Sequence, residues 1–243
     1  MGELQKLGIK PPSKNTVKSI LKGVGLDPGP QRGEGTWDDF LKRHAASLWQ
    51  CDFFSRNVLT TNGIRQAFVL AFVHVKTRRV ILSPATYRTD SAWVAKQAEA
   101  FVEQARADGL PVGRLMRDRD SAFSKVFDAV VRRRRVRVVT TSFRAPNMNA
   151  YAERFVQSIK QECLDHFVVF GTQHLDHLCK EYLEYFHTER PHQGLENELL
   201  VKPPAPKSKK RKTKPLPDVV PLSSIRCQTR LGGLLKHYSR KAA

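Results

Sequence analysis

Five short apolar segments, in two groups that differ in how they are connected, constrain the fold most strongly. Residues 48–54, 66–75 and 78–84 are apolar or aromatic and are bounded by turn residues, as is typical of neighbouring antiparallel strands. Residues 113–116 and 136–141 are also strand-like, but helical patterns precede them, and strands joined through helices favour parallel pairing. The sequence therefore predicts an α/β fold with a mixed five-stranded sheet flanked by helices.

Apolar residues at helical spacing separate and follow these segments. Stripes of this kind begin near Asp90, after Asn149 and near Thr172, and a shorter one covers residues 121–131. Their i, i+3, i+4 spacing predicts amphipathic helices. The helix after Asn149 also has a polar stripe. Glu153, Gln157 and Lys160 form it, because they lie at i, i+4 and i+7.

Composition divides the chain into four segments. Residues 1–24 hold a helical pattern with Ser13 as its N-cap, which we interpret as a partial helix-turn-helix DNA-binding segment. Residues 25–46 begin with a Pro- and Gly-rich stretch and are expected to be a linker. Residues 47–200 hold the sheet and its helices, and residues 201–243 form a basic C-terminal arm ending in a segment that we expect to be a short helix. Because the amphipathic pattern begins almost at the first residue, we also expect an upstream portion to be missing.

The charge balance indicates a nucleic-acid partner. Lys and Arg total 42 against 23 acidic residues, which gives a net charge of +19, and a polyanion is the natural counterpart of such a surface. Candidate DNA contacts lie at both ends of the chain. They are Lys14, Lys18 and Lys22 in the N-terminal helix and Lys209, Lys210, Arg211 and Lys212 in the basic arm.

Other sequence features indicate the compartment. The chain has no apolar run of the length that a membrane span needs, and its first residues lack the apolar stretch of a signal peptide. Its four cysteines form no CxxC pair, which favours reduced thiols over disulfides or a zinc site. These features predict a cytoplasmic protein with no membrane partner.

Three acidic residues far apart in the sequence are the candidate site. Asp52 and Asp118 each follow a short apolar run, and Glu153 lies at the start of a helix. A carboxylate at a strand end is a rigid oxygen ligand of the kind that Mg²⁺ prefers, and the two aspartates meet if their strands are neighbours. Asp120 lies two residues after Asp118 and is an alternative to it, either as the ligand or as the N-cap of the next helix.

Three ordered motifs resemble the catalytic core of retroviral integrases and bacterial insertion-sequence transposases, the DDE group. NMNAYAERFVQSIKQECLDH is the strongest match, and RDRDSAF and YFHTERPHQGL accompany it. The resemblance covers residues 48–200. It implies a ribonuclease-H-like fold, so that residues 47–200 are the integrase catalytic core.

The resemblance also implies a reaction and its residues. Asp52, Asp118 and Glu153 become the catalytic, metal-binding triad, and Lys160 becomes the helix lysine that contacts the DNA end. From Asp118 to Glu153 there are 153 − 118 = 35 positions, within one of the family's usual interval. The implied cofactor is Mg²⁺ or Mn²⁺, as two ions, with no organic cofactor. The implied reaction is 3′-end processing and strand transfer on element ends and target DNA by a homo-oligomer in a bacterial cytoplasm, where it associates with the nucleoid. Further DNA-binding candidates are Gln157 and Arg190.

Two alternatives from other classes stay open. The abrupt N-terminus and the run Arg132–Arg135, where relatives often have Gly, favour a catalytically impaired, DNA-binding transposase remnant. A ribonuclease-H-like nuclease that cuts without joining is the other alternative.

Overall fold

The computed structural model describes residues 13–25, 37–142, 146–201 and 221–240. The chain divides into two compact units, Met1–Arg43 and His44–Ala243. None of the described helices combines the length with the apolar composition that crossing a membrane requires.

The first unit contains the predicted N-terminal helix. This helix, α2, spans Lys14–Gly23, and the Ser13 hydroxyl caps it by accepting a hydrogen bond from Thr16 N at 3.1 Å. A second helix, α3, spans Trp37–His44. Its first turn contains Asp38 and Asp39, whose negative charges interact favourably with the helix dipole. The segment expected to be a linker therefore contains a helix in its second half.

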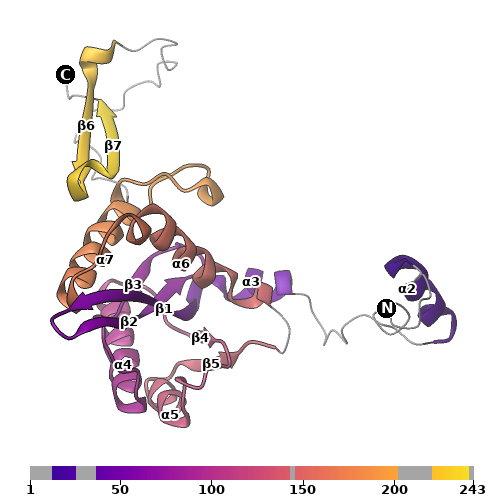
Figure 1. Ribbon diagram of the computed structural model, residues 1–243. Helices are drawn as coiled ribbons and strands as arrows, with labels where there is room; N and C mark the ends of the chain where they lie inside the picture. Colours follow the sequence, from indigo (N-terminus) through magenta and orange to yellow (C-terminus); the bar gives the residue numbers. More distant parts are fainter. Residues whose placement is uncertain (1–12, 26–36, 143–145, 202–220, 241–243) are drawn as a thin grey trace, which may run out of the picture. The chain divides into compact units, whose positions relative to one another are not determined.

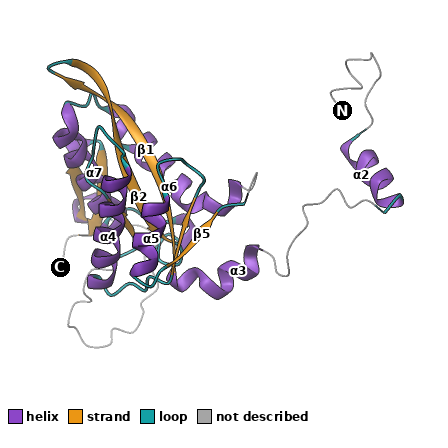
Figure 2. Ribbon diagram, turned by 90° about the horizontal axis from the view of Figure 1, so that it is seen from below, coloured by secondary structure: helices purple, strands orange, loops and turns teal. Residues whose placement is uncertain are grey.

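The first three strands form an antiparallel sheet, as predicted. β1 spans Leu48–Thr60, β2 spans Gly63–His74 and β3 spans Val80–Leu82. β1 and β2 pair without interruption from Trp49↔His74 to Thr60↔Gly63. Together they form a long hairpin that extends beyond the helices (Figure 2).

The last two strands of this sheet are parallel to β1. β4 spans Arg114–Arg117 and pairs with β1, and β5 spans Arg137–Thr140 and pairs with β4. The strand order is β3-β2-β1-β4-β5. The predicted mixed five-stranded sheet is thus confirmed, and β1 lies at its centre.

Helices cover both faces of the sheet (Figure 1). On one face, α4 (Ser91–Ala107) and α5 (Lys125–Arg133) pack on a core that includes Trp49 and Cys51 of β1. On the other face, α6 (Ala150–Glu162) and α7 (Gly171–Thr188) pack on a core that includes Phe54 of β1. Because side chains of a strand alternate between faces, the even-numbered residues around Phe54, Asp52 among them, face α6.

The C-terminal segment is a β-hairpin, so the predicted short helix is wrong. β6 (Ile225–Arg230) and β7 (Leu235–Arg240) pair antiparallel. The helical prediction overlooked the turn between them, where Gly232 and Gly233 have φ values of 66° and 95°, which glycine adopts most readily. Leu235 is only 4% exposed and belongs to the core beneath α6 and α7. The basic arm that precedes the hairpin lies outside the described residues.

Three of the four cysteines are buried, as expected of reduced core thiols, and the expectation is wrong for Cys227. Cys51, Cys163 and Cys179 are buried, Cys227 is exposed, and all four are free thiols. Burial raises the pKa of Cys163 to about 12, so this thiol stays protonated and packs as an apolar group.

Candidate active site

The pairing of β1 with β4 sets Asp52 and Asp118 next to each other. The paired residues Leu48↔Arg114 and Gln50↔Met116 have a constant offset, since 114 − 48 = 116 − 50 = 66. Asp52 and Asp118 have the same offset, since 118 − 52 = 66, and lie just beyond the last paired residues. In a parallel pair, residues in register point to the same face of the sheet. The two carboxylates therefore leave neighbouring strands on the side that α6 covers.

The prediction that Asp52 ends its strand is wrong. β1 continues to Thr60, and Asp52 pairs with Ala71 of β2 within the long hairpin. Only the pairing with β4 stops before Asp52. The length of β1 was missed because the polar and exposed residues of its outer half break the apolar pattern that the sequence analysis followed. A rigid two-stranded support thus holds the aspartate more firmly than a strand end would.

The electrostatics of Asp52 link the three predicted acids. The pKa of Asp52 is raised from 3.8 to about 7, mostly by burial, then by the negative charge of Asp118 and, more weakly, by that of Glu153. A hydrogen bond from the backbone of Phe53 and the positive charge of Lys160 oppose this rise. The pKa of Asp52 on β1 is therefore influenced by Asp118, just after β4, and by Glu153 on α6. Lys160, on the same stripe of α6 as Glu153, influences it too.

Asp118 and Asp120 differ in their surroundings. Asp118 is half-buried, its Oδ1 accepts from Asp120 N at 3.1 Å, and its carbonyl accepts from Arg117 Nη1 at 2.9 Å. Asp120 is exposed, and its Oδ1 accepts from Ala122 N at 2.8 Å. Both carboxylate bonds join an aspartate to the amide two residues on, as in turns, so the two residues differ in burial and in register with Asp52. The position beside Asp52 belongs to Asp118, while Asp120 shapes the turn that follows β4.

Gln50, which the sequence analysis did not select, joins the start of α6 to β1. Its side chain is fully buried, and its Oε1 accepts from Tyr151 N at 2.9 Å and Ala152 N at 3.2 Å. Its Nε2 donates to Met148 O at 2.6 Å. These bonds satisfy amide groups that the first turn of a helix leaves free, and they position the turn that carries Glu153. The sequence could have indicated this residue, because Gln50 is a polar side chain within the apolar run LWQCDFF.

A second hydrogen bond joins the same two segments. Asn149 Nδ2 donates to Cys51 O at 3.2 Å. Glu153 itself is exposed on the first turn of α6. The strand that carries Asp52 and the helix that carries Glu153 are therefore joined through the Gln50 side chain and the Cys51 carbonyl.

The predicted DNA-binding residues lie in several places. Lys160 is half-buried on α6, and Gln157 is exposed there, with its Oε1 accepting from Arg154 Nη1 at 3.0 Å. Arg190 instead forms two hydrogen bonds to Glu162, at 2.8 and 2.6 Å, so much of its charge is neutralised within the fold. Lys22 is exposed on the last turn of α2. The side chains of Lys14 and Lys18 and the residues Lys209, Lys210, Arg211 and Lys212 lie outside the described part of the chain.

The acids have the donor chemistry for a divalent cation. Within the described residues, no group of three His, Cys, Asp or Glu side chains is arranged to hold a metal ion. Mg²⁺ needs only one or two carboxylates when water and substrate phosphate supply its other ligands, so Asp52 and Asp118 suffice in kind and number.

Comparison with known proteins identifies part of this region. Residues 134–198 match the family model of the integrase core domain. The matched range includes Glu153 and Lys160, whereas Asp52 and Asp118 precede it. A comparison with curated proteins gives no match.

Solved structures of retroviral integrases align with a larger part of the chain. A chain of the simian T-cell lymphotropic virus intasome in complex with the PP2A regulatory subunit B56 gamma has 16% identity and a TM-score of 0.48, over 81% of this chain and 67% of its own. The HTLV-2 integrase catalytic core domain in complex with magnesium, in its trimeric form, has 15% identity and a TM-score of 0.48, over 64% and 93%. The catalytic core domain of BIV integrase has 15% identity and a TM-score of 0.45, over 64% and 91%.

Residues 134–198 are thus similar to the integrase core domain.

Proposed function

We propose that this protein is a transposase that processes DNA 3′ ends and joins them to target DNA in a metal-dependent reaction. The observation that carries the proposal is the register of β1 and β4, which sets Asp52 beside Asp118. The pKa of Asp52, raised mainly by burial and then by Asp118 and Glu153, agrees with this arrangement. Three acids from separate elements repel one another in an integrase core whose chain has a net charge of +19. Such a cluster of carboxylates in a cationic protein suits a site for divalent metal and DNA.

The residues of the site have separate roles in this proposal. Asp52 and Asp118 hold Mg²⁺ or Mn²⁺ as rigid oxygen ligands, and Glu153 completes the site from α6. A pair of such ions, when bound, activates the attacking oxygen and stabilises the leaving oxygen at phosphorus. Lys160 lies seven residues beyond Glu153, on the same stripe of α6, where its charge holds the phosphate backbone of the element end.

The reaction needs no covalent intermediate with the protein. Water first hydrolyses a phosphodiester at the element end and leaves a 3′ hydroxyl. That hydroxyl then attacks a target phosphodiester, a new phosphodiester bond forms, and the displaced target strand leaves with its own 3′ hydroxyl. Because two element ends must be joined together, we propose that a homo-oligomer assembles on DNA in the bacterial cytoplasm.

A strand-transfer assay with labelled terminal DNA tests this proposal. The purified protein should nick and join the DNA in Mg²⁺ or Mn²⁺ and be inactive in EDTA. Asp52→Asn and Glu153→Gln should each reduce joining by about a hundredfold or more, because metal ligands contribute several kcal/mol to phosphoryl transfer. Variants as active as the parent would refute the mechanism. Binding without cleavage would instead identify a DNA-binding remnant, and cleavage without joining would identify a nuclease.

A further inference from the structure

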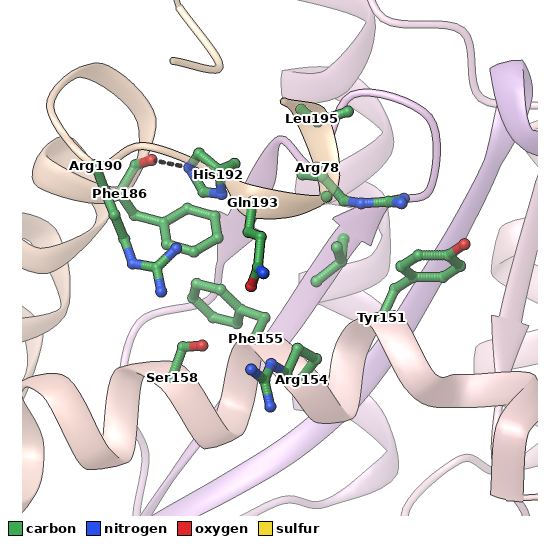
Figure 3. A pocket seen from close by; sticks show the side chains of 12 residues that line it. Arg78, Tyr151, Arg154, Phe155, Ser158, Phe186, Arg190, His192, Gln193 and Leu195 are labelled. Carbon is green, nitrogen blue, oxygen red and sulfur yellow. Dashed lines mark hydrogen bonds between the residues drawn. The ribbon is translucent and has the colours of Figure 1, made fainter. Parts of the chain in front are cut away.

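A cavity on the side of α6 next to the acid stripe has the chemistry of an anion site. It has a volume of about 310 Å³ and lies between α6, the turn that joins β2 to β3, and the segment that follows α7 (Figure 3). We call it the arginine pocket. The lining residues that matter for its chemistry are Arg78, Tyr151, Arg154, Ser158, Arg190 and Gln193.

The arginine pocket has a net positive charge. Three arginines line it, and none of the described lining residues is acidic. Arg190 donates two hydrogen bonds to Glu162, which does not line the pocket, and this carboxylate neutralises the charge of Arg190. Burial lowers the pKa of His192, another lining residue, so His192 is neutral at pH 7. Arg78 and Arg154 therefore supply two charges that no lining carboxylate compensates.

Arg78 is held in place, and among the described residues its Nη1 has no acceptor. Its backbone has a φ of 61° and its amide donates to His74 O at 2.8 Å, so the turn after β2 directs the side chain. Its guanidinium stacks on Tyr151 with 3.9 Å between Cζ and the ring centroid, and Figure 3 shows the two side chains facing each other. Among the described residues, Nη1 is buried without any hydrogen-bond partner. A buried donor of this kind is costly unless an acceptor reaches it.

Arg154 supplies the second charge from α6. Its Nη1 donates to Gln157 Oε1 at 3.0 Å, which is a neutral acceptor that leaves the charge of Arg154 uncompensated. Ser158, one turn further along α6, adds a hydroxyl to the same lining. Planar guanidinium groups match the oxygen geometry of phosphate in particular.

One helix serves both sites. Glu153, Gln157 and Lys160 share one stripe of α6, while Tyr151, Arg154 and Ser158, at i, i+3 and i+7, line the arginine pocket on an adjacent stripe. The arginine pocket therefore lies on the side of α6 next to the stripe where a nucleic-acid strand would be held at the acids. The side chain of Arg154, bonded to Gln157, bridges the two stripes.

We propose that the arginine pocket binds a backbone phosphate of the DNA strand, outside the acidic site, through Arg78 and Arg154. This inference rests on the proposed function in that DNA is the substrate. The same cationic chemistry would also accept a free phosphate or a mononucleotide, and the experiment distinguishes these sources.

A pair of substitutions at Ser158 tests the charge of the pocket directly. Ser158→Glu and Ser158→Gln introduce side chains of nearly equal size, and only the first introduces a negative charge. In EDTA, where no cleavage takes place, Ser158→Glu should bind duplex DNA roughly five- to tenfold more weakly at 0.1 M salt than Ser158→Gln. Equal affinities of these two folded variants would overturn the proposal.

Removing the arginines tests the phosphate contact itself. Arg154→Ala and Arg78→Gly should each weaken binding about five- to tenfold at 0.1 M salt and reduce the slope of log affinity against log salt by about one. Glycine suits the backbone at position 78 because the φ there is positive. The matched control is Arg133→Ala, which removes an exposed charge on α5, on the opposite face of the sheet. If this control lowers the affinity and the slope equally, the pocket has no special role.

Nuclear magnetic resonance of the Arg78 side chain identifies the source of the phosphate. A single-stranded oligonucleotide should shift its Nε–H resonance at far lower concentration than inorganic phosphate or a mononucleotide does. A response to the small anions alone would overturn the DNA assignment, as would no response to any of them. These readouts do not depend on catalysis, so loss of the proposed strand transfer and loss of the pocket would be seen separately.

Discussion

At the residue scale, Asp52 shows a conflict between stability and function. Its pKa is raised from 3.8 to about 7, mainly by burial and then by Asp118. The folded chain therefore keeps this proton between about pH 4 and pH 7, where the unfolded chain has released it. The free energy of unfolding falls as the pH rises through this window. At about 1.4 kcal/mol per pKa unit, the shift corresponds to at most about 4 kcal/mol.

This conflict predicts that Asp52→Asn stabilises the metal-free protein while it abolishes strand transfer. At pH 8 the variant avoids the buried charge, so we expect its free energy of unfolding to exceed that of the parent by roughly 1–3 kcal/mol. Urea unfolding of both proteins at pH 5 and pH 8 in EDTA measures the effect, and the difference should shrink at pH 5. Mg²⁺ should stabilise the parent more than the variant. A variant no more stable than the parent at pH 8 would contradict the shifted pKa.

Gln50 carries a second prediction at this scale. Gln50→Ala removes the acceptor of two amides on the first turn of α6 and the donor to Met148 O, so it should lower the free energy of unfolding by roughly 2–3 kcal/mol. Amide hydrogen exchange at Tyr151 and Ala152 should accelerate. Gln66→Ala is the control, because Gln66 is exposed and donates only to Ser55 Oγ in the described structure. Unchanged exchange at those amides would show that Gln50 does not fasten the helix.

These residues also show what the sequence can reveal about a site. Asp52, Asp118 and Glu153 are visible because carboxylates after apolar runs and at a helix start are unusual and ordered along the chain. The partners of Gln50 are visible only in three dimensions, since its acceptor oxygen meets amides about a hundred positions away. The bond between Arg190 and Glu162 is hidden for the same reason. Local patterns report residue types, whereas tertiary contacts decide which of them meet.

At the element scale, periodicity predicted the sheet well and the C-terminal hairpin poorly. The strands and helices from β1 to α7 have apolar patterns that match their burial, because each packs on one of the two cores. The β6–β7 hairpin buries only Leu235 of its described residues, so its pattern carries little periodic signal. In the Arg132–Arg135 run, Arg132 contacts Asp128 and Arg134 contacts Glu99 and Glu103. These two arginines thus have partners within the fold, which the sequence alone did not indicate.

The hairpin provides a prediction at this scale. Arg230 at the end of β6 bonds to Glu181 at 3.1 Å and to Glu189 at 2.7 Å, and an isolated two-stranded hairpin is only marginally stable. Arg230→Ala should therefore accelerate amide exchange throughout β6 and β7, while the exchange of the five-stranded sheet stays within about twofold of the parent. The control is Arg226→Ala, which alters an exposed residue of the same strand. An equal effect of both variants would contradict the anchoring role of Arg230.

At the scale of the whole molecule, the charge of +19 predicts a strongly salt-dependent interface with DNA. If the protein neutralises about six phosphates, log affinity should fall against log salt with a slope of roughly −5. Fluorescence anisotropy of labelled terminal DNA between about 50 and 300 mM salt gives this slope. A flat profile would mean that the basic surface does not contact the phosphate backbone.

The central claim is that Asp52, Asp118 and Glu153 form one catalytic site and that Asp120 does not belong to it. The most direct measurement compares strand transfer by Asp118→Asn and Asp120→Asn, with labelled terminal DNA in Mg²⁺. We predict that Asp118→Asn lowers joining by about a hundredfold or more, because it removes a metal ligand. Asp120→Asn keeps an acceptor for Ala122 N and should stay within about threefold of the parent. Full activity of Asp118→Asn, or an equal loss in both variants, would contradict the account.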